Sequence, residues 1–539
     1  MTLARSPYAI FKAAAARFPA RPFLHAPAET AKIYDLKKTD YAYGDAATEI
    51  SRLQAAYEKL GAGVRVGLAF ENRPEFFLHF LALNGLGAGI VPLNCAMQDD
   101  ELLYQISHSE CALIAAHGAF VDRLAAVAAH APHSPAVFAP EQLSDARITL
   151  GGRAKSTHEP TLEAAILYTS GTTGKPKGCI LSNDYFCAIG DLYTGLGGCV
   201  TFEDGAERII TPLPVTHMNA LACSFMAAVK TGGCLIQLDR FHPKSWWKTV
   251  RESRATIMHY LGVMPAMLLQ AAQTPEDDFS TQIKFAFGAG CDPRHHARFE
   301  ERFGVRLIEA WAMTETGAGA WITASAEPRH VGTRCFGKAP AGLETRLVDE
   351  EGRDVAQGVA GELLVRRAGA DPRRHFFSGY FKDEAATEEA WGGGWFHTGD
   401  AVRQDDDGYF YFVDRLKNVI RRSGENIAAI DVESVLMRHE GVAACVVVPV
   451  PDEIRGDEVM ALLISSDGEK TEARARSVFD HAMDNLVYFK APGYVAFVDA
   501  IPVTASEKVK RSEAKAIGRK LLEEDACFNF NPLKKARKG

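Results

Sequence analysis

The sequence contains no long hydrophobic run, no long block of like charges and no paired cysteines. No apolar stretch approaches the ~18 residues that a membrane-spanning helix needs, so we expect no transmembrane segment. The 11 cysteines are scattered, with no Cys-x-x-Cys pair and no histidine cluster nearby. This distribution argues against a zinc site and a disulfide framework, and reduced thiols in a cytoplasmic protein are the simplest interpretation.

The net charge is also small for the length of the chain. A formal charge of -8 on 539 residues gives no reason to expect a nucleic-acid partner or an anionic membrane surface. Residues 1–20 predict an amphipathic helix and not a signal peptide. The chain ends in a short basic tail that we expect to be solvated, formed by Lys534, Lys535, Arg537 and Lys538.

The length and the hydrophobic patterns predict an α/β protein of at least two domains. Strand patterns at 64–70 and 89–93, with a helix pattern at 74–86 between them, are typical of a parallel, helix-covered sheet. Residues 131–140 read as a loop. Residues 332–413 show short strands between Gly and Asp turns, which indicates a small β-rich or barrel-like subdomain.

A glycine-rich stretch at 168–178, Tyr-Thr-Ser-Gly-Thr-Thr-Gly-Lys-Pro-Lys-Gly, is the strongest chemical signal in the sequence. Strand patterns on both sides, at 164–168 and 179–181, predict that it connects two strands. Its glycines allow successive N–H groups to converge on one anion, while its hydroxyls add donors and its two lysines add charge. These features indicate phosphate binding.

Two other interpretations of this stretch are weaker. A Walker A loop requires four residues between its glycines and Ser or Thr after the lysine, whereas two residues separate Gly171 from Gly174 and Pro176 follows Lys175. A flexible surface hairpin would explain the small polar residues but not the interleaved lysines.

The 168–178 stretch resembles the signature loop of the adenylate-forming superfamily, which includes acyl-CoA and aryl-CoA synthetases, carrier-protein adenylation domains and luciferases. Within it, the sequence is most similar to carnitine/crotonobetaine-type and medium-chain acyl-CoA ligases. The resemblance implies a large N-terminal domain of helix-covered sheets with a small β-barrel-like subdomain at 1–414, a hinge at 415–418 and a small mobile α/β C-terminal domain at 419–539.

The resemblance assigns the nucleotide site to several separate segments. It places Thr314 on phosphate, Glu315 on Mg²⁺, Trp311 on adenine, and Asp400 with Arg415 on the ribose, and a carboxylate such as Glu315 is a ligand that Mg²⁺ prefers. The full predicted ATP site is Thr169, Ser170, Gly171, Thr172, Thr173, Gly174, Lys175, Gly288, Ala289, Gly290, Glu309, Ala310, Trp311, Thr314, Asp400 and Arg415.

The resemblance also implies an acid site and two sets of residues for two half-reactions. Predicted acid-binding residues are His217, at the end of a predicted strand, Ala312 and Gly317; a helix at 218–229 would wall the acyl pocket. By itself, His217 is more typical of a hydrogen-bonded packing residue than of a binding residue. The predicted catalytic residues are Lys508, Thr314 and Glu315; Lys417 is the predicted hinge, and Ser423, Gly424 and Glu425 form the loop for the thioester step.

These assignments predict an AMP-forming acid–thiol ligase of a type found in fatty acid metabolism. A carboxylic acid would attack the α-phosphate of ATP and release pyrophosphate, and the acyl group would then pass to the thiol of CoA. Two alternatives stay open: loading of a carrier-protein phosphopantetheine, and a nucleotide-binding pseudoenzyme, which the departures Ala312, Ala429 and Glu507 from the family pattern motivate. The expected partners are the small-molecule acid, ATP and CoA, with a homodimer left open.

Overall fold

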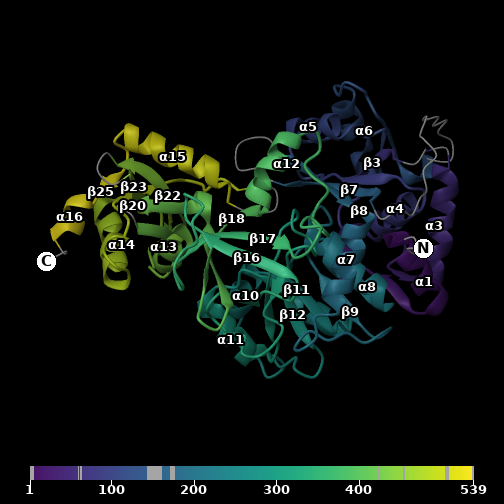
Figure 1. Ribbon diagram of the computed structural model, residues 1–539, viewed down its shortest axis with the longest axis horizontal. Coiled ribbons are helices and arrows are strands. Elements are labelled where there is room, and N and C mark those ends of the chain that lie inside the picture. Colours follow the sequence, from purple (N-terminus) through teal and green to yellow (C-terminus); the bar gives the residue numbers. More distant parts are fainter. Residues whose placement is uncertain are drawn as a thin grey trace. The chain divides into compact units, whose positions relative to one another are not determined.

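The computed structural model describes residues 5–58, 60, 63–142, 161–169, 176–422, 425–452, 456–503 and 509–536 (Figure 1). By its internal contacts the chain divides into two compact units. Unit 1 comprises Met1–Arg346, Leu364–His397 and Gln404–Tyr411, and unit 2 comprises Leu347–Leu363, Thr398–Arg403 and Phe412–Gly539. The boundaries at 414 and 419 and the hinge between them stay a prediction.

A six-stranded sheet in unit 1 carries the strands on both sides of the glycine-rich stretch. Its spatial order is β6 (Ala136–Phe138), β5 (Leu113–Ala116), β3 (Arg65–Ala69), β4 (Gly89–Pro92), β7 (Glu163–Thr169) and β8 (Lys177–Ser182). The strands from β6 to β7 are parallel, and β8 pairs with β7 in the antiparallel direction. The predicted strands at 64–70, 89–93, 164–168 and 179–181 are therefore confirmed, and 131–140 holds an edge strand instead of only a loop.

An eight-stranded sheet forms the rest of the framework of unit 1. Its spatial order is β14 (Ile322–Thr323), β13 (Leu307–Trp311), β12 (Phe285–Ala289), β11 (Ile257–Leu261), β9 (Arg208–Thr211), β10 (Cys234–Gln237), β1 (Pro22–His25) and β2 (Asp40–Ala42). The six strands from β13 to β1 are parallel, and both edge strands are antiparallel. The carboxyl ends of β11, β12 and β13 therefore lie next to one another.

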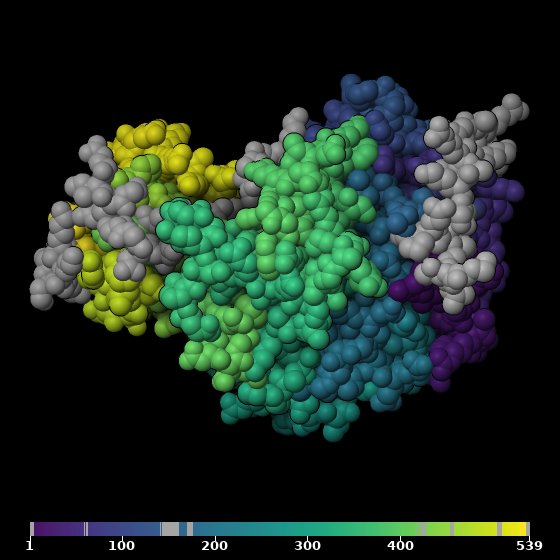
Figure 2. Space-filling view, viewed as in Figure 1, coloured from purple at the N-terminus to yellow at the C-terminus, as the bar shows by residue number. Residues whose placement is uncertain are grey.

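A layer of helices packs against both sheets. It consists of α1 (Pro7–Arg17), α3 (Tyr43–Tyr57), α4 (Pro74–Gly85), α7 (Asn183–Thr194) and α8 (Phe225–Thr231). Helix α4 contacts β3 and β4, while α8 contacts β10, and Phe77 of α4 stacks on Phe225 of α8 with ring centroids 4.9 Å apart. A helix enclosed in this way buries apolar side chains on most of its faces, which explains the mainly apolar segment that predicted α4. Figure 2 shows the purple amino-terminal segment against the blue part of unit 1.

The remaining helical segments before residue 395 lie at other positions around these sheets. They are α2 (Ala28–Ile33), α5 (Asp99–Ser109), α6 (Gly118–Ala128), η1 (Pro140–Gln142), η2 (Asn219–Ser224), α9 (Trp246–Glu252), α10 (Val263–Leu269), α11 (Pro293–Phe303), α12 (Glu384–Ala390) and η3 (Gly392–Gly394). The helix predicted at 218–229 is a π-helical turn, η2, that continues into α8. Within the described residues, no helix has both the length and the hydrophobicity that a membrane crossing requires.

The β-rich region predicted at 332–413 forms a five-stranded sheet. Its order is β15 (Cys335–Lys338), β19 (Tyr409–Arg415), β18 (Phe396–Gln404), β17 (Gly361–Arg367) and β16 (Leu343–Val348), and its residues are divided between the two units. The short turn η4 (Leu416–Asn418) follows β19 and contains Lys417.

The rest of unit 2 is a six-stranded sheet with helices, which agrees with the small α/β C-terminal domain that the resemblance implied. Its strands are β20 (Val419–Arg422), β21 (Glu425–Ala428), β22 (Val442–Asp452), β23 (Gly456–Ser465), β24 (Tyr494–Phe497) and β25 (Phe528–Asn529). Its helices are α13 (Ala429–Leu436), α14 (Glu472–Asn485), α15 (Arg511–Glu523) and α16 (Asn531–Ala536). The prediction of a solvated basic tail is wrong for Lys534. The Lys534 side chain is 1% exposed, because it pairs with the buried Glu458.

Candidate functional site

The predicted adenine segments meet at the carboxyl ends of β12 and β13. Gly288 lies in register with Glu309 on one side and with Tyr260 of β11 on the other. A Cβ atom at position 288 would lie 2.2 Å from the carbonyl oxygen of Tyr260, so only glycine permits this approach. Ala289 and Gly290 are exposed at the end of the strand, which leaves their backbone accessible to a flat ligand.

The carboxylate of Glu309 holds this turn in place from inside the protein. It accepts hydrogen bonds from Gly290 N at 2.8 Å, Cys291 N at 3.0 Å and the hydroxyl of Tyr260 at 2.6 Å. Burial raises the pKa of Glu309, although these three donors act in the opposite direction. The carboxylate is thus engaged within the protein, and Glu309 supports the predicted adenine turn through these hydrogen bonds.

Glu315, the predicted Mg²⁺ ligand, lies close to the strand that leads into the glycine-rich loop. Its Oε1 atom is 3.5 Å from the Thr169 hydroxyl, 146 positions away in sequence, and accepts a hydrogen bond of 3.1 Å from the Tyr380 hydroxyl. Its side chain is buried together with Thr316, while Thr314 is partly exposed. A hard carboxylate oxygen beside hydroxyl donors is a donor set that fits Mg²⁺ and phosphate.

Tyr380 is a site residue that the sequence did not indicate. Burial, and then the neighbouring Glu315 carboxylate, raise the pKa of its hydroxyl, so the hydroxyl stays protonated and can donate. The Lys177 Nζ atom lies 4.8 Å from the centre of its ring. The segment 378–381 reaches this position by pairing with β8, through hydrogen bonds such as Phe381 N to Gly178 O at 2.8 Å.

A tight turn at 313–317 shapes the edge of the site. The Met313 amide donates to the Thr316 hydroxyl at 2.9 Å, and Gly317 N donates to Met313 O at 3.0 Å. Gly317 has a φ of 48°, and a Cβ atom there would lie 2.3 Å from Cε2 of Tyr185. The Tyr185 hydroxyl in turn donates to the Thr314 carbonyl at 2.8 Å. Gly317 is therefore required by close packing, whatever it contributes to acid binding.

Three other predicted residues on β13 and just after it differ in exposure. Trp311 is buried, and its ring stacks on Phe336 with centroids 6.1 Å apart. Ala312 is partly exposed, as is Ala310. Stacking of Trp311 on adenine stays a prediction.

His217 does not end a strand, contrary to the sequence prediction. Strand β9 ends at Thr211, because Pro212 and Pro214 lack the amide hydrogen that a sheet ladder needs. His217 lies in the turn that follows, where its amide donates to Pro214 O at 3.0 Å, and its carbonyl accepts from Leu221 N at 3.1 Å at the start of η2.

A buried histidine supports the segment after His217. His259 Nδ1 lies 2.6 Å from Asn219 Oδ1 and 2.9 Å from the Ser224 hydroxyl, and its Nε2 lies 2.9 Å from the Tyr193 hydroxyl. Burial lowers the pKa of His259 to about 3, so the ring is neutral. This network ties η2 to β11, and no sequence pattern indicated it.

The two predicted ribose residues are neighbours within unit 2. Arg415 Nε lies 2.8 Å from Asp400 Oδ1. The Asp400 side chain is 1% exposed and that of Arg415 is 42% exposed. The structure thus brings these two residues together, and the Asp400 side chain is buried in this arrangement.

Several predicted residues lie outside the described residues. These are Ser170, Gly171, Thr172, Thr173, Gly174, Lys175, Ser423, Gly424 and Lys508. For Lys417 and Glu425 the structure describes the backbone, in η4 and at the start of β21.

Two further clusters in the described part of the chain contain groups of metal-binding or catalytic type. Ligand atoms of Cys291, His296 and Glu309 lie within 4.8 Å of one another, but Glu309 accepts the three hydrogen bonds given above, and His296 Nε2 lies 3.1 Å from the Leu307 carbonyl oxygen. These contacts already use the polar atoms, so the cluster serves as packing.

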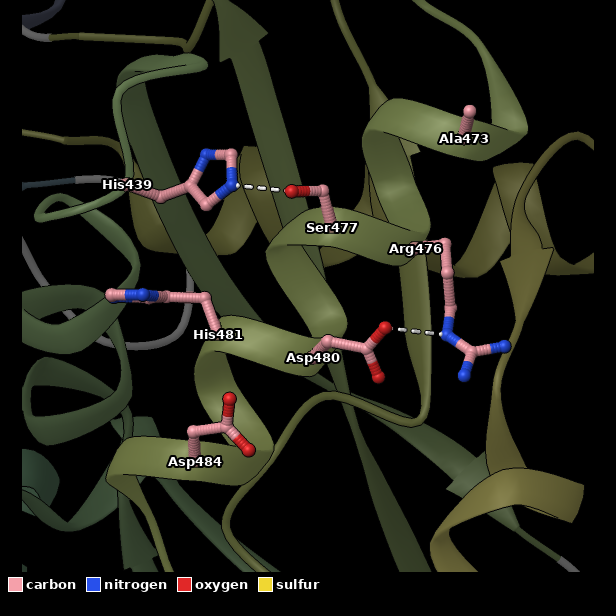
Figure 3. A pocket seen from close by; sticks show the side chains of 7 residues that line it. All are labelled: His439, Ala473, Arg476, Ser477, Asp480, His481 and Asp484. Carbon is pink, nitrogen blue, oxygen red and sulfur yellow. Dashed lines mark hydrogen bonds and ion pairs between the residues drawn. The ribbon is translucent and has the colours of Figure 1, made fainter.

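A pocket of about 550 Å³ lies in unit 2, beside α14 (Figure 3). Its polar side chains pair with one another: His439 Nε2 lies 2.9 Å from the Ser477 hydroxyl, and Arg476 Nε donates to Asp480 at 2.8 Å. The lining residues are His439, Ala473, Arg476, Ser477, Asp480, His481 and Asp484. None of them is a predicted site residue.

Comparison with known families gives two matches that cover most of the chain. Residues 11–381 match the model of the AMP-binding enzyme family, and residues 431–508 match the model of the AMP-binding enzyme C-terminal domain.

Comparison with individual proteins gives relatives that align over nearly their whole length. A crotonobetaine/carnitine–CoA ligase of Proteus mirabilis is 28% identical over 491 residues, which are 88% of this chain and 92% of that protein. The corresponding protein of Salmonella typhi is also 28% identical, over 88% of this chain and 93% of its own length.

Solved structures share the fold over most of both chains. An anthranilate CoA ligase in complex with anthranoyl-AMP has a TM-score of 0.81 at 20% identity, covering 97% of this chain and 99% of its own. The o-succinylbenzoate CoA synthetase of Bacillus subtilis, in complex with its acyl-adenylate intermediate, has a TM-score of 0.77 at 23% identity, covering 95% and 98%. The same enzyme with ATP and magnesium has a TM-score of 0.76 at 22% identity, covering 94% and 99%.

Proposed function

This chain belongs to the family of AMP-binding enzymes, and from this membership we propose that it is an AMP-forming acid–CoA ligase. It activates a carboxylic acid with ATP as an acyl-adenylate, releases pyrophosphate, and passes the acyl group to the thiol of CoA. The observation that carries the proposal is the meeting of Thr169 and Glu315, whose side-chain oxygens lie 3.5 Å apart. This contact joins the strand before the glycine-rich loop to the turn that follows β13.

The residues of unit 1 suit the first half-reaction, in which negative charge spreads over the phosphate oxygens. Backbone amides of the glycine-rich loop and the hydroxyls of Thr169 and Thr314 donate hydrogen bonds to phosphate. Glu315 is the carboxylate that would hold Mg²⁺, which neutralises phosphate charge when bound. Tyr380 fixes the orientation of that carboxylate through its hydrogen bond to Oε1.

Residues of unit 2 complete the proposal. Asp400 and Arg415 hold the ribose, Lys508 stabilises charge in the adenylation step, and Ser423 to Glu425 serve the thioester step, with Lys417 as the hinge. These roles are supported by the motifs of the sequence, and for Lys508 also by the match of 431–508 to the C-terminal domain of AMP-binding enzymes. The reactants make the cytoplasm the expected location.

The relatives guide the choice of acid and acceptor. The similar curated proteins are named for crotonobetaine and carnitine, and the similar solved structures for anthranilate and o-succinylbenzoate. We propose a small or medium-sized, partly polar acid. Since all of these proteins are named as CoA ligases or synthetases, CoA is favoured over a carrier protein.

The test is a screen for acid-dependent pyrophosphate release. The purified protein is incubated with ATP and Mg²⁺ and, in turn, with crotonobetaine, carnitine, anthranilate, o-succinylbenzoate and straight-chain medium-length fatty acids, with and without CoA. We expect pyrophosphate release with one class of acid and an acyl-CoA product by mass spectrometry when CoA is present. Glu315→Gln is the matched inactive control.

Two results would contradict the proposal. ATP binding without pyrophosphate release for any acid would point to a nucleotide-binding pseudoenzyme. Pyrophosphate release without transfer to CoA, but with transfer to carrier proteins, would point to an adenylation enzyme for carrier loading.

A further inference from the structure

Three charged side chains meet in the interior of unit 2. Arg422 Nε lies 2.7 Å from one oxygen of Glu458, and Lys534 Nζ lies 2.7 Å from the other. Their side chains are 7%, 0% and 1% exposed. Lys534 Nζ also donates to Ala491 O at 2.6 Å, and Val459 N donates to Glu458 Oε1 at 2.8 Å. We call Arg422, Glu458 and Lys534 the buried triad.

The three members come from distant parts of the chain. Arg422 ends β20, Glu458 lies in β23, and Lys534 lies in α16 (Figure 1). The match to the C-terminal domain of AMP-binding enzymes ends at 508, so Lys534 belongs to a segment beyond that match. The segment at 509–536 therefore contributes a buried charge to the interior of unit 2.

Contacts of the segment 528–530 place the following helix α16, which contains Lys534. Strand β25 pairs with β24, and the Phe530 amide donates to Gly493 O at 2.8 Å. The Phe530 ring stacks on Phe479 with centroids 4.9 Å apart. Gly493 also leaves room for Glu458, because a Cβ atom at 493 would lie 2.6 Å from Glu458 Cγ.

Stability alone does not account for a buried ionic cluster of this kind. Bringing charges out of water is costly, and well-packed apolar side chains often replace a buried ion pair without loss of stability. Removing Glu458 would leave two uncompensated cations inside the protein. Removing Lys534 leaves the Arg422–Glu458 ion pair, but it takes from Glu458 Oε1 a charge-assisted hydrogen bond that helps to orient this carboxylate. Two cations on one carboxylate therefore fix where the Arg422 side chain lies.

Arg422 directly precedes in sequence the residues 423–425, to which the proposed function assigns the thioester step. In the hairpin of β20 and β21, Arg422 is in register with Glu425, and we call these two residues the hairpin end. Arg422 is also in register with Gly456 at the start of β23. A side chain clamped at this point sets the position of the hairpin end relative to the sheet.

We propose that Glu458 and Lys534 are positioning residues for the thioester half-reaction, acting through Arg422 on the hairpin end. The inference rests on the proposed function for the role of that hairpin. It predicts that a chain end outside the C-terminal-domain match is needed for acyl transfer to CoA but not for adenylation.

The main experiment separates the two half-reactions in Lys534→Met. Adenylation is followed as acid-dependent pyrophosphate exchange, using the acid with the highest turnover in the screen above. Thioester formation is followed from the synthetic adenylate of that acid and CoA. We expect the rate of thioester formation to fall about tenfold to a hundredfold, as for other small displacements of reacting groups. The rate of pyrophosphate exchange should stay within about twofold of the unmodified protein, a change close to 0.4 kcal/mol that a displaced reactive group would far exceed.

The matched control is Lys520→Met, in the same segment of the chain. Lys520 is 71% exposed and lies 3.8 Å from Glu524 on the surface of α15, so the same chemical change should leave both half-reactions unaltered. A second variant replaces the whole triad with apolar residues, Arg422→Met, Glu458→Leu and Lys534→Met together. It should fold even where the single variant does not, and it should still lose the second half-reaction.

A measurement without substrate tests the structural part of the inference. Hydrogen exchange of the amides at 419–428 should become faster in Lys534→Met, whereas exchange in α14 should not change. Equal losses in both half-reactions, or a triple variant with full thioester activity, would overturn the inference. Absence of acid-dependent pyrophosphate exchange in the unmodified protein would instead refute the proposed function.

Discussion

Replacing Tyr380 by Phe tests the central contact of the candidate site. The substitution removes the hydroxyl that donates to Glu315 Oε1 at 3.1 Å and keeps the ring that faces Lys177. A hydrogen bond to a charged, buried acceptor contributes about 1.5–3 kcal/mol. If that energy serves to orient Glu315 toward Mg²⁺, the loss corresponds to about a ten- to hundredfold lower kcat/KM.

The assay is the adenylation half-reaction at a series of Mg²⁺ concentrations. We expect Tyr380→Phe to require more Mg²⁺ for half-maximal pyrophosphate exchange and to have a lower kcat/KM for ATP. Because burial and the Glu315 charge raise the pKa of Tyr380, the hydroxyl donates throughout the neutral range. The defect should therefore be the same at pH 7 and pH 9.

Tyr43→Phe is the matched control for a buried hydroxyl. Tyr43 donates to the carbonyl oxygens of Ala228 and Gly233, both at 2.9 Å, and no predicted site residue takes part in these contacts. We expect a loss of about 1–3 kcal/mol in unfolding free energy with an unchanged Mg²⁺ dependence. An unaltered kcat/KM and Mg²⁺ requirement in Tyr380→Phe would refute the role given to this hydrogen bond.

Three further predictions concern stability and nucleotide binding. Burial lowers the pKa of His259 to about 3, so as pH falls from about 6.5 towards 3 only the unfolded chain gains this proton, and the free energy of unfolding declines by about 1.4 kcal/mol per pH unit. His259→Gln should remove this pH dependence in urea titrations at several pH values. An unchanged pH dependence would count against the role given to His259. Gly317→Ala places a Cβ atom 2.3 Å from Tyr185 Cε2 at a φ of 48° and should cost about 1–3 kcal/mol, visible as a lower Tm, whereas an equal Tm would show that the turn relaxes freely. Asp400→Asn removes the charge 2.8 Å from Arg415 Nε and should weaken ATP binding about tenfold, or about 1.4 kcal/mol, in calorimetric titration; an unchanged Kd would remove both residues from the ribose site.

Local patterns predicted most of the framework. The loop at 168–178 does connect two paired strands, β7 and β8, and the strand before 288–290 is β12. These predictions succeed because a buried strand or an enclosed helix needs an apolar run, which is visible in sequence. The prediction that a strand ends at His217 was wrong, since two prolines end β9 at Thr211.

The supporting residues of the site were not predictable in this way. Tyr380, Tyr260 and His259 act through hydrogen bonds to residues between 35 and 66 positions away. A lone tyrosine or histidine in an apolar segment is typical of core packing, so its sequence context carries no sign of its partner. The buried Lys534 likewise looked like part of a solvated tail.

The sequence by itself determined the α/β framework, the glycine-rich stretch that we propose binds phosphate, and the residue types that a magnesium nucleotide needs, because these depend on local hydrophobicity and on side-chain chemistry. The tertiary structure alone decided which groups meet: Thr169 with Glu315, Asp400 with Arg415, and Arg422 and Lys534 with Glu458. Such pairs join residues far apart in the chain, and their contacts arise only when the sheets pack and bring distant strand ends to one edge.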